Sequence, residues 1–383
     1  MIYLDHAATS PLRPAVWDAM SRIVGTADFN PASIHSAGGR AAEVLERARQ
    51  QIAAALGTER SNILFTGGGT QSDNLAVLGF ARSAGETARL LVSAVEHKAV
   101  LEAARRAAVE GSTVEVMPVD SAGRLDPQTL EDRLSTDDGR PALVSVMWAN
   151  SEVGTVQPVR ELCEVAHRYG AFFHTDAVQA FGKVSVSLDA VPADLLTVTA
   201  HKLGGPVGIG LLARCGDVSL EPLSYGGSQE RAMWPGTQNP VGAAGFAEAV
   251  RLADSEFPES ADRWTDLRTD LERRLREAVP DLRVHAEGSP ERLPHLLSVG
   301  IPGCDQAVLL TALDLAGISV SAGSACASGV STGSHVLEAM GVRPAGDYAV
   351  LRFSFGPATT STDIETAAGT VAGAVARLRG SRR

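Results

Sequence analysis

The chain has 383 residues, of which 44% are hydrophobic and 21% are charged, a composition typical of a water-soluble globular protein. Its formal net charge of −11, without a block of Lys and Arg, argues against nucleic acid as an obligatory partner but does not exclude a small anionic ligand. For a chain of this length we expect two domains, or one large α/β domain with an appendage.

The N-terminal segment MIYLDHAATSPLRP lacks the basic and apolar regions of a signal peptide. The chain also lacks the apolar run of about 18 residues that a transmembrane helix needs. Its four cysteines are too widely spaced for a zinc cluster, and the chain is too long for a small disulfide scaffold. They are Cys163, Cys215, Cys304 and Cys326. We therefore expect free thiols, no metal site, no membrane partner and a cytoplasmic location.

Between about residues 60 and 215, short apolar runs alternate with helical patterns. The expected strands are Ile63–Phe65, Arg89–Ala94, Val114–Pro118, Ala142–Met147, Ala171–Thr175, Leu195–Thr199 and Ile209–Ala213. Several of these runs are apolar throughout, as strands covered by helices on both faces should be. This alternation predicts an α/β fold with a mostly parallel sheet, which binds its ligands at the carboxyl ends of the strands.

Two helices in this region have clear sequence signals. Asp126 and Pro127 suit the N-cap and first position of a helix. A second helix begins at Pro158 and ends at Gly170, with Cys163 on its apolar face. Further along, residues 246–280 resemble long charged helices joined at Pro258, and we interpret them as the bridge to a smaller C-terminal domain.

Polar groups follow the predicted strands. The glycine-rich turn TGGGTQSDN opens an apolar helix, so its free N–H groups and the side chains of Thr70, Gln71 and Ser72 suit a phosphate, although a purely structural turn is equally compatible. His97, Asp176 and Lys202 come directly after three other strands. Taken singly, Asp176 could be a helix N-cap and Lys202 a solvated surface residue.

Together these groups match what pyridoxal 5′-phosphate (PLP) needs. Its phosphate suits a helix N-terminus, its pyridine nitrogen an acid, and its aldehyde a lysine amine. The same motifs occur in the same order in cysteine desulfurases, which this chain resembles along nearly its whole length. They are IYLDHAATSP, NPASIHSAG, TGGGTQSDN, VEHKAV, HTDAVQ, TAHKLGG, GTQN, SAGSACASG and RFSFGPATT.

Cysteine desulfurases are PLP enzymes of the class V aminotransferase group with the aspartate-aminotransferase-like fold, fold type I. The resemblance implies a large PLP-binding domain over residues 14–255, built on a mostly parallel seven-stranded sheet. Residues 1–13 and 256–383 would form a smaller α+β domain carrying the cysteine loop at about residues 321–334. That loop resembles the long-loop, iron–sulfur-assembly type.

The resemblance also implies roles for single residues. Lys202 would be the Schiff-base lysine, Asp176 would contact the pyridine nitrogen, and His97 would stack on the ring. The remaining cofactor contacts would come from Thr70, Gln71, Thr199 and His201, from Thr237 of the other subunit of a homodimer, and from Gln179, Asn150 and Ser151. Arg352 would bind the substrate carboxylate, with Asn30 nearby.

In this scheme the Cys326 thiolate takes sulfur from L-cysteine as a persulfide, releases L-alanine, and passes the sulfur to an acceptor protein. A protonated His97 is a candidate for lowering the pKa of that thiol. Two positions depart from the family pattern: Ser151 stands where the family has asparagine, and Trp234 stands where it commonly has arginine. Selenocysteine lyase, or another class V PLP aminotransferase or lyase, is the alternative interpretation. The acceptor and its pathway stay open.

Overall fold

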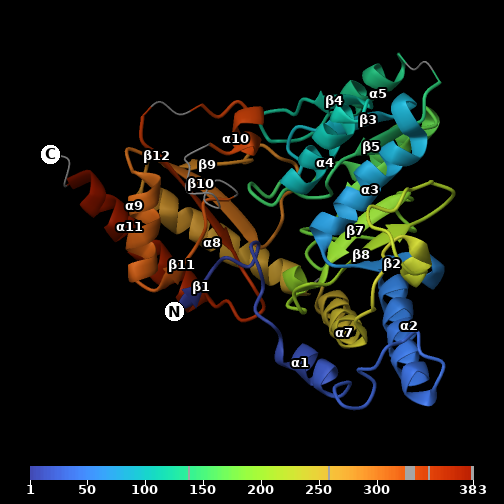
Figure 1. Cartoon of the computed structure of the whole chain (residues 1–383). Helices are drawn as coiled ribbons and strands as arrows, with labels where there is room; N and C mark the ends of the chain where they lie inside the picture. The colour runs from blue at the N-terminus through green and yellow to red at the C-terminus, as the bar shows by residue number, and fades with distance from the viewer. Residues whose placement is uncertain (137–138, 258, 324–332, 344–345, 381–383) are drawn as a thin grey trace.

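The computed structural model describes residues 1–136, 139–257, 259–323, 333–343 and 346–380. Cys326 lies outside the described residues, so its role stays a prediction. Figure 1 shows two groups of elements, with the orange and red C-terminal elements beside a larger group coloured blue to yellow. The blue N-terminal strand β1 (Ile2–Tyr3) lies with the C-terminal group.

A seven-stranded sheet forms the centre of the larger group. Every expected strand is present, and each begins and ends within two residues of its expected position. In spatial order the strands are β2 (Ile63–Thr66), β8 (Gly210–Arg214), β7 (Leu195–Thr199), β6 (Phe172–Asp176), β5 (Ala142–Ser145), β3 (Arg89–Ser93) and β4 (Thr113–Met117). The pairs from β7 to β4 are parallel, which confirms the predicted α/β class with a mostly parallel seven-stranded sheet.

Strand β8 is the exception, since it runs antiparallel to both β2 and β7. The connection from β7 to β8 contains only the short 3₁₀ helix η3 (Ala200–Leu203) and a turn. A parallel return would need a crossover of about a dozen residues or more, so this short connection imposes the antiparallel direction. It also keeps Lys202 at the edge of the sheet.

Both faces of this sheet are buried under helices. Along β2, Ile63 and Phe65 belong to one hydrophobic core while Leu64 belongs to the other, because successive strand side chains point to opposite faces. The first core also contains side chains of α2 (Ser36–Leu56), α5 (Pro127–Leu134), α6 (Val159–Arg168) and α7 (Pro240–Glu256). The second contains α3 (Gly69–Ala84) and α4 (Lys98–Val109).

Helix ends follow the sequence signals. The Asp126 side chain accepts a hydrogen bond from the N–H of Gln128 at the start of α5, as predicted. Helix α6 begins at Val159, directly after Pro158, and buries Cys163 as expected. The remaining short elements here are α1 (Pro14–Ser21), η1 (Arg60–Asn62), η2 (Gly85–Thr87) and η4 (Gln229–Ala232).

A separate core surrounds an antiparallel sheet of β12 (Tyr348–Ser354), β10 (Leu296–Pro302) and β9 (Arg283–Val284). Helices α8 (Glu259–Ala278), α9 (Gln306–Leu315) and α11 (Ser361–Gly380) pack on it. Strand β1 pairs with β11 (Ile318–Ser319), and α10 (His335–Ala339) contributes to a small neighbouring cluster. Leu4 lies in this core, so the N-terminal segment packs with the C-terminal elements. The exact domain boundaries at residues 14 and 255 stay a prediction.

Candidate active site

A cavity of about 390 Å³ lies beside the carboxyl ends of β3, β6 and β7. Arg352 of β12 also lines it. It is lined by ten of the residues singled out from the sequence. These are Thr70, His97, Asn150, Ser151, Asp176, Gln179, Thr199, His201, Lys202 and Arg352. The parallel sheet explains the convergence of the strand-end residues, because the carboxyl ends of neighbouring parallel strands meet at one edge.

Ser72 is buried outside this cavity, with its Oγ in a hydrogen bond with Thr66 Oγ1. Three further predicted residues also lie outside the cavity in the single chain. The side chain of Gln71 lies against Gly67 and Gly68 of the glycine-rich turn. Asn30 uses its Oδ1 to accept a hydrogen bond from the N–H of Ala32 in an exposed loop. Thr237 lines a separate cavity of about 160 Å³. The roles predicted for these three residues stay predictions.

Buried carboxyl groups form one wall of the cavity. Asp73, Glu96 and Asp176 all line it, and each is at most 6% exposed. Burial raises the pKa of all three groups, to about 8 for Glu96. Oδ1 of Asp73 and Oε2 of Glu96 have no hydrogen-bond partner within the described part of the chain. This wall therefore favours a ligand group that is cationic or can donate a hydrogen bond.

Lys202 lines the same cavity as these acids. Its Nζ donates hydrogen bonds to the carbonyl oxygens of Ala7 and Ala8, at 2.6 and 2.7 Å. Burial, together with the charge of Arg352, lowers the pKa of Lys202 to about 8. An appreciable fraction of the amine is consequently neutral near that pH, as a nucleophile or a proton acceptor requires.

Two histidines of the cavity are fixed in defined tautomers by their backbone contacts. His97 Nδ1 accepts a hydrogen bond from the N–H of Ala99 at the start of α4, so its proton resides on Nε2 when the ring is neutral. His335 has the reverse requirement at Nε2, which lies 2.9 Å from the carbonyl oxygen of Glu96 and must donate to it. His335 Nδ1 is then left as an acceptor.

The predicted protonated state of His97 is not favoured here. Burial is the largest influence on the ring and lowers its pKa. A second proton would also remove the Nδ1 lone pair that accepts from the N–H of Ala99. His335, which the sequence analysis did not single out, also lines this cavity, and its Nδ1 is the ring nitrogen that can accept a proton. Its only sequence signal was its position a few residues after the cysteine-bearing stretch.

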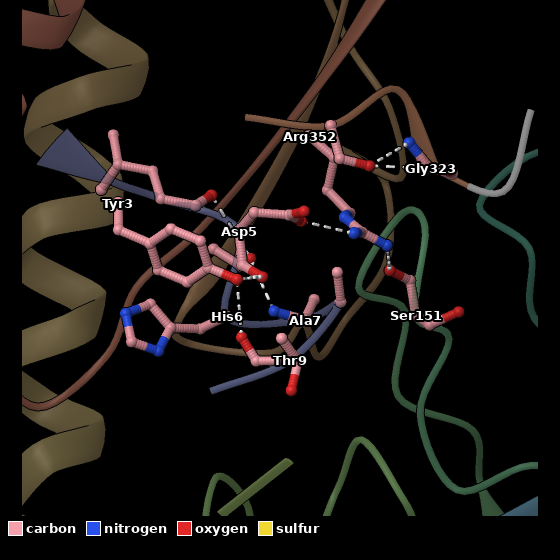
Figure 2. Close-up of polar contacts among 12 residues, drawn as sticks. Tyr3, Asp5, His6, Ala7, Thr9, Ser151, Gly323 and Arg352 are labelled. Carbon is pink, nitrogen blue, oxygen red and sulfur yellow. Dashed lines mark hydrogen bonds and ion pairs between the residues drawn. The ribbon is translucent and has the colours of Figure 1, made fainter. Parts of the chain in front are cut away.

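Arg352 lies on β12 and lines the cavity. Figure 2 shows its guanidinium between Asp5 and Ser151. Its Nη2 donates to Asp5 Oδ1 at 2.7 Å, and its Nη1 donates to the carbonyl oxygen of Ser151 at 2.9 Å. Nε has no hydrogen-bond partner among the described residues. The guanidinium is thus held in one orientation while retaining a free donor for a carboxylate.

The backbone of Arg352 also contacts the segment that leads towards Cys326. Its N–H donates to the carbonyl oxygen of Ser321, and Ser321 Oγ in turn accepts from the N–H of Gly323. Gly323 is the last described residue before position 324. The predicted substrate residue and the start of the cysteine-bearing segment are therefore side by side (Figure 2).

A family model described as "Aminotransferase class-V" matches residues 2–366. The chain belongs to the class-V aminotransferase family. It is 40% identical to the putative cysteine desulfurase IscS 1 of Bacillus subtilis (strain 168), over 98% of this chain and 99% of that protein. It is also 40% identical to the IscS-like cysteine desulfurase of Mycobacterium tuberculosis, over 99% and 97% of the two chains.

Solved structures support the same assignment. A NifS-like protein superposes with a TM-score of 0.90 at 32% identity, covering 98% of this chain and 99% of the other. The predicted resemblance to cysteine desulfurases and the predicted type I fold are confirmed. None of the described helices combines the length and apolar character that crossing a bilayer requires.

PLP is the cofactor of this class-V family, and the polar atoms of the cavity fit it. Gln179 Nε2 donates to the carbonyl oxygen of Ala7. Its Oε1 is buried, has no hydrogen-bond partner among the residues that the structure describes, and can accept from a ring hydroxyl. Asp176 would supply the acid for the ring nitrogen and Lys202 the amine for the aldehyde, since both line the cavity. The N-terminus of α3, at Gly69 and Thr70, supplies N–H donors for the phosphate.

Steric limits explain why glycine occupies two positions at the phosphate turn, Gly68 and Gly210. A Cβ added to Gly210 of β8 would lie 2.7 Å from the carbonyl carbon of Gly68. Gly68 itself has φ 148°, a conformation that side chains rarely adopt. These two glycines allow β8 to approach the turn closely and fix the start of α3 at the sheet edge.

The two departures from the family pattern lie in different places. Ser151 lines the cavity and contacts Arg352 through its backbone, so the shorter side chain leaves that contact intact. Trp234 lines the smaller cavity with Thr237 and approaches Gly67 of the phosphate turn. An aromatic ring therefore stands beside the turn where the family commonly has a basic side chain.

Proposed function

We propose that this protein is a cysteine desulfurase that converts L-cysteine to L-alanine and transfers the sulfur to Cys326. The observation that carries this proposal is the arrangement of the Lys202 amine, the Asp176 carboxyl and the Arg352 guanidinium around one cavity. A structural relative, "SspA in complex with cysteine", supports the choice of substrate, with a TM-score of 0.80 at 28% identity over 94% of this chain and all of that chain.

Substrate binding begins with a carboxylate at Arg352. The guanidinium is already oriented by Asp5 and by the Ser151 carbonyl, so little conformational entropy is lost when the substrate arrives. Asp73, Glu96 and Asp176, which line the same cavity, disfavour a substrate carboxylate beside them. L-cysteine would therefore bind with its carboxylate towards β12 and its amino group towards Lys202.

PLP, when bound, supplies an electron sink for the charge that develops at the substrate Cα. The Lys202 amine takes the Cα proton, which its lowered pKa of about 8 permits. Asp176 holds a positive charge at the ring nitrogen. His97, which follows β3 in the chain, lines the cavity and would donate a hydrogen bond from Nε2–H.

Sulfur transfer then requires no external oxidant. The Cys326 thiolate forms an S–S bond with the substrate sulfur as the Cβ–S bond breaks, and the electron pair of that bond stays on Cβ, which is protonated. The products are L-alanine and a persulfide on Cys326. His335 Nδ1 would accept the thiol proton, since its Nε2 is already committed to Glu96. An acceptor protein would then take the terminal sulfur.

We further propose a homodimer and a cytoplasmic enzyme. Thr237 lines a cavity separate from that of its own Lys202, which agrees with its predicted contribution to the partner's site. The described cysteines, Cys163, Cys215 and Cys304, are free thiols, as a reducing compartment would keep them.

The test is a product assay. Purified protein is incubated with L-cysteine and dithiothreitol, and sulfide and L-alanine are measured together. We expect equal amounts of both from the wild type and almost none from Cys326→Ala, with Cys215→Ala as the matched control that retains activity. Wild-type rates of both products from Cys326→Ala would overturn the proposed role of Cys326. Absence of both products from the wild type would overturn the proposed function.

A further inference from the structure

A second cavity, of about 590 Å³, lies on the other side of Lys202. It is formed by the N-terminal segment, the end of α7, the start of α8 and the loop before α11. Lys202 lines both cavities, but its Nζ is turned towards Ala7 and Ala8 of the active-site cavity. Among the residues that the structure describes, Lys202 is the one that the two linings have in common.

A buried lysine lines this second cavity. Lys183 is 5% exposed, and its Nζ contacts only carbonyl oxygens, of Phe181 at 3.5 Å and of Lys202 at 3.4 Å. Both distances are long for a hydrogen bond from an ammonium group. In the part of the chain that the structure describes, no carboxylate forms an ion pair with Lys183. Its positive charge is therefore uncompensated by the protein.

The surroundings of Lys183 add further basic groups instead of acids. His6 lines the same cavity, and Lys183 is among the charges that lower the pKa of His6 and of the fully buried His295. Burial and the charge of Lys202 lower the pKa of Lys183 itself to about 7. An anion placed here would stabilise the ammonium form that the protein alone disfavours.

The two acids on the cavity wall are already engaged. Glu256 forms an ion pair with Arg13, and Asp363 accepts hydrogen bonds from the backbone and hydroxyl of Thr360. Neither neutralises Lys183. The chain has only three lysines, Lys98, Lys183 and Lys202, among its 34 Lys and Arg residues. Two of the three, Lys183 and Lys202, line this cavity.

The rest of the lining is largely apolar. Leu12, Leu203, Trp264 and Phe355 contribute side chains, and the Trp264 indole N–H is occupied by the carbonyl oxygen of Gly356. A cavity of this size with apolar walls and one buried charged group has the character of a small-molecule site. The apolar walls select a ligand with a hydrocarbon body, and Lys183 selects a single negative charge.

We propose that this cavity binds a small monocarboxylate, with its carboxylate on Lys183 Nζ and its apolar body against Leu203, Trp264 and Phe355. Free amino acids such as L-cysteine and L-alanine are excluded, because their ammonium group would lie beside Lys183 and His6. The site is distinct from the substrate position at Arg352, and the proposal does not depend on desulfurase activity.

The experiment is calorimetric titration of the holoenzyme with hexanoate. Hexanamide, which has the same hydrocarbon body without the charge, and L-alanine are the comparison ligands. We expect hexanoate to bind at least about tenfold more tightly than hexanamide, and L-alanine not to bind at this site. Hexanoate should also change the fluorescence of Trp264, and the change should disappear in Trp264→Phe.

Variants locate the site. Lys183→Met should weaken hexanoate binding at least about tenfold, Lys183→Arg should keep it within about threefold, and Lys98→Met should leave it unchanged. Retention of binding in Arg352→Lys would support the second cavity, and loss of binding in that variant would place hexanoate in the active site and overturn the proposal. Equal affinities for hexanoate and hexanamide, or wild-type affinity in Lys183→Met, would also overturn it. Thermal unfolding of each variant verifies that it is folded.

Discussion

On the large-sheet side of Lys202 the buried ionisable groups are mainly acids, namely Asp73, Glu96 and Asp176. On the side of the N-terminal segment they are bases: Lys183, His6 and His295. His174 is a base on the acidic side, but burial lowers its pKa to about 3 and keeps it neutral. Within the described residues, no ion pair joins one of these three acids to Lys183, His6 or His295, and the contact of His174 with Asp73 lies within the acidic side.

The comparison shows how burial prepares each side for a ligand of opposite charge. Desolvation raises the pKa values of the acids and lowers those of the bases, so both sets are pushed towards their neutral forms. A cationic ring nitrogen would stabilise the ionised form of Asp176, and the proposed carboxylate would stabilise the ammonium form of Lys183. Lys202 stands between the two sides, with its own pKa lowered to about 8.

The largest expected effect comes from removing the acid that we propose for the ring nitrogen, Asp176. Asp176→Asn keeps the shape of the side chain and the acceptor for the N–H of Val178 but cannot carry a negative charge. We expect kcat for L-cysteine to fall about 10²–10³-fold, as when one preorganised electrostatic contact is lost. Steady-state alanine production measures this, and the absorbance of bound cofactor reports occupancy. The exposed N-cap variant Asp126→Asn is the control and should be fully active.

The next effect concerns stability on the acidic side. The pKa of Glu96 is raised to about 8 in the folded protein, so the unfolded chain releases this proton first as the pH rises. Glu96 therefore lowers the free energy of unfolding as the pH rises. The decrease is absent below pH about 4.5, grows between that pH and pH about 8, and then stays constant. Glu96→Gln cannot ionise, and Oε1 of the amide can still accept from Ser93 and from the N–H of Met147.

Between pH 6 and pH 9, the free energy of unfolding should therefore fall less in Glu96→Gln than in the wild type. The difference should be a few kcal/mol, and each kcal/mol corresponds to roughly 2–4 °C in Tm. Thermal unfolding of the holoenzyme across this pH range is the measurement. Identical pH profiles for the two proteins would show that Glu96 is ionised in the fold and would remove it from the neutral acids of this side.

A smaller effect, on KM, is expected from changing Asp5, which holds the guanidinium of Arg352. Asp5→Asn removes the charge that orients Arg352 but leaves an amide oxygen that can accept the same hydrogen bond. We expect KM for L-cysteine to rise about tenfold, with kcat nearly unchanged. A lower KM would mean instead that Asp5 competes with the substrate for Arg352. Thr26→Ala is the control for general disturbance, because within the described chain this exposed hydroxyl of the N-terminal region donates only to the backbone carbonyl oxygens of Arg22 and Ile23.

The smallest effect is expected at residues 230–232, which belong to neither the acidic nor the basic side. A substitution there serves as a reference for the pH dependence of stability. Glu230, Arg231 and Ala232 are three successive non-glycine residues with positive φ, and Ala232 has φ 62°. Ala232→Gly relieves the steric cost of this conformation, so we expect the free energy of unfolding to rise by about 1 kcal/mol. The pH dependence of stability should keep its wild-type shape. Destabilisation in urea would show that the run is not strained in the native protein.

Much of the fold followed from local patterns. The apolar runs of the central sheet were strong signals because strands covered on both faces need apolar side chains at every position, as β7 shows. The strand-end residues Asp176 and Lys202 followed from the same patterns, because parallel neighbours place their carboxyl ends together. Asp73 and Glu96 were present in the quoted motifs but carried no signal of their burial.

The sequence by itself therefore determined the sheet, its strand positions and the groups at its edge, since these depend on residues close together in the chain. Only the tertiary structure decided the contacts between distant segments: Asp5 with Arg352, 347 residues apart, and the walls of the cavity beside Lys183. It also decided the tautomers of His97 and His335 and the placement of Thr237 in a separate cavity. These features arise from packing between separate cores, and burial and charge there depend on neighbours that no local pattern specifies.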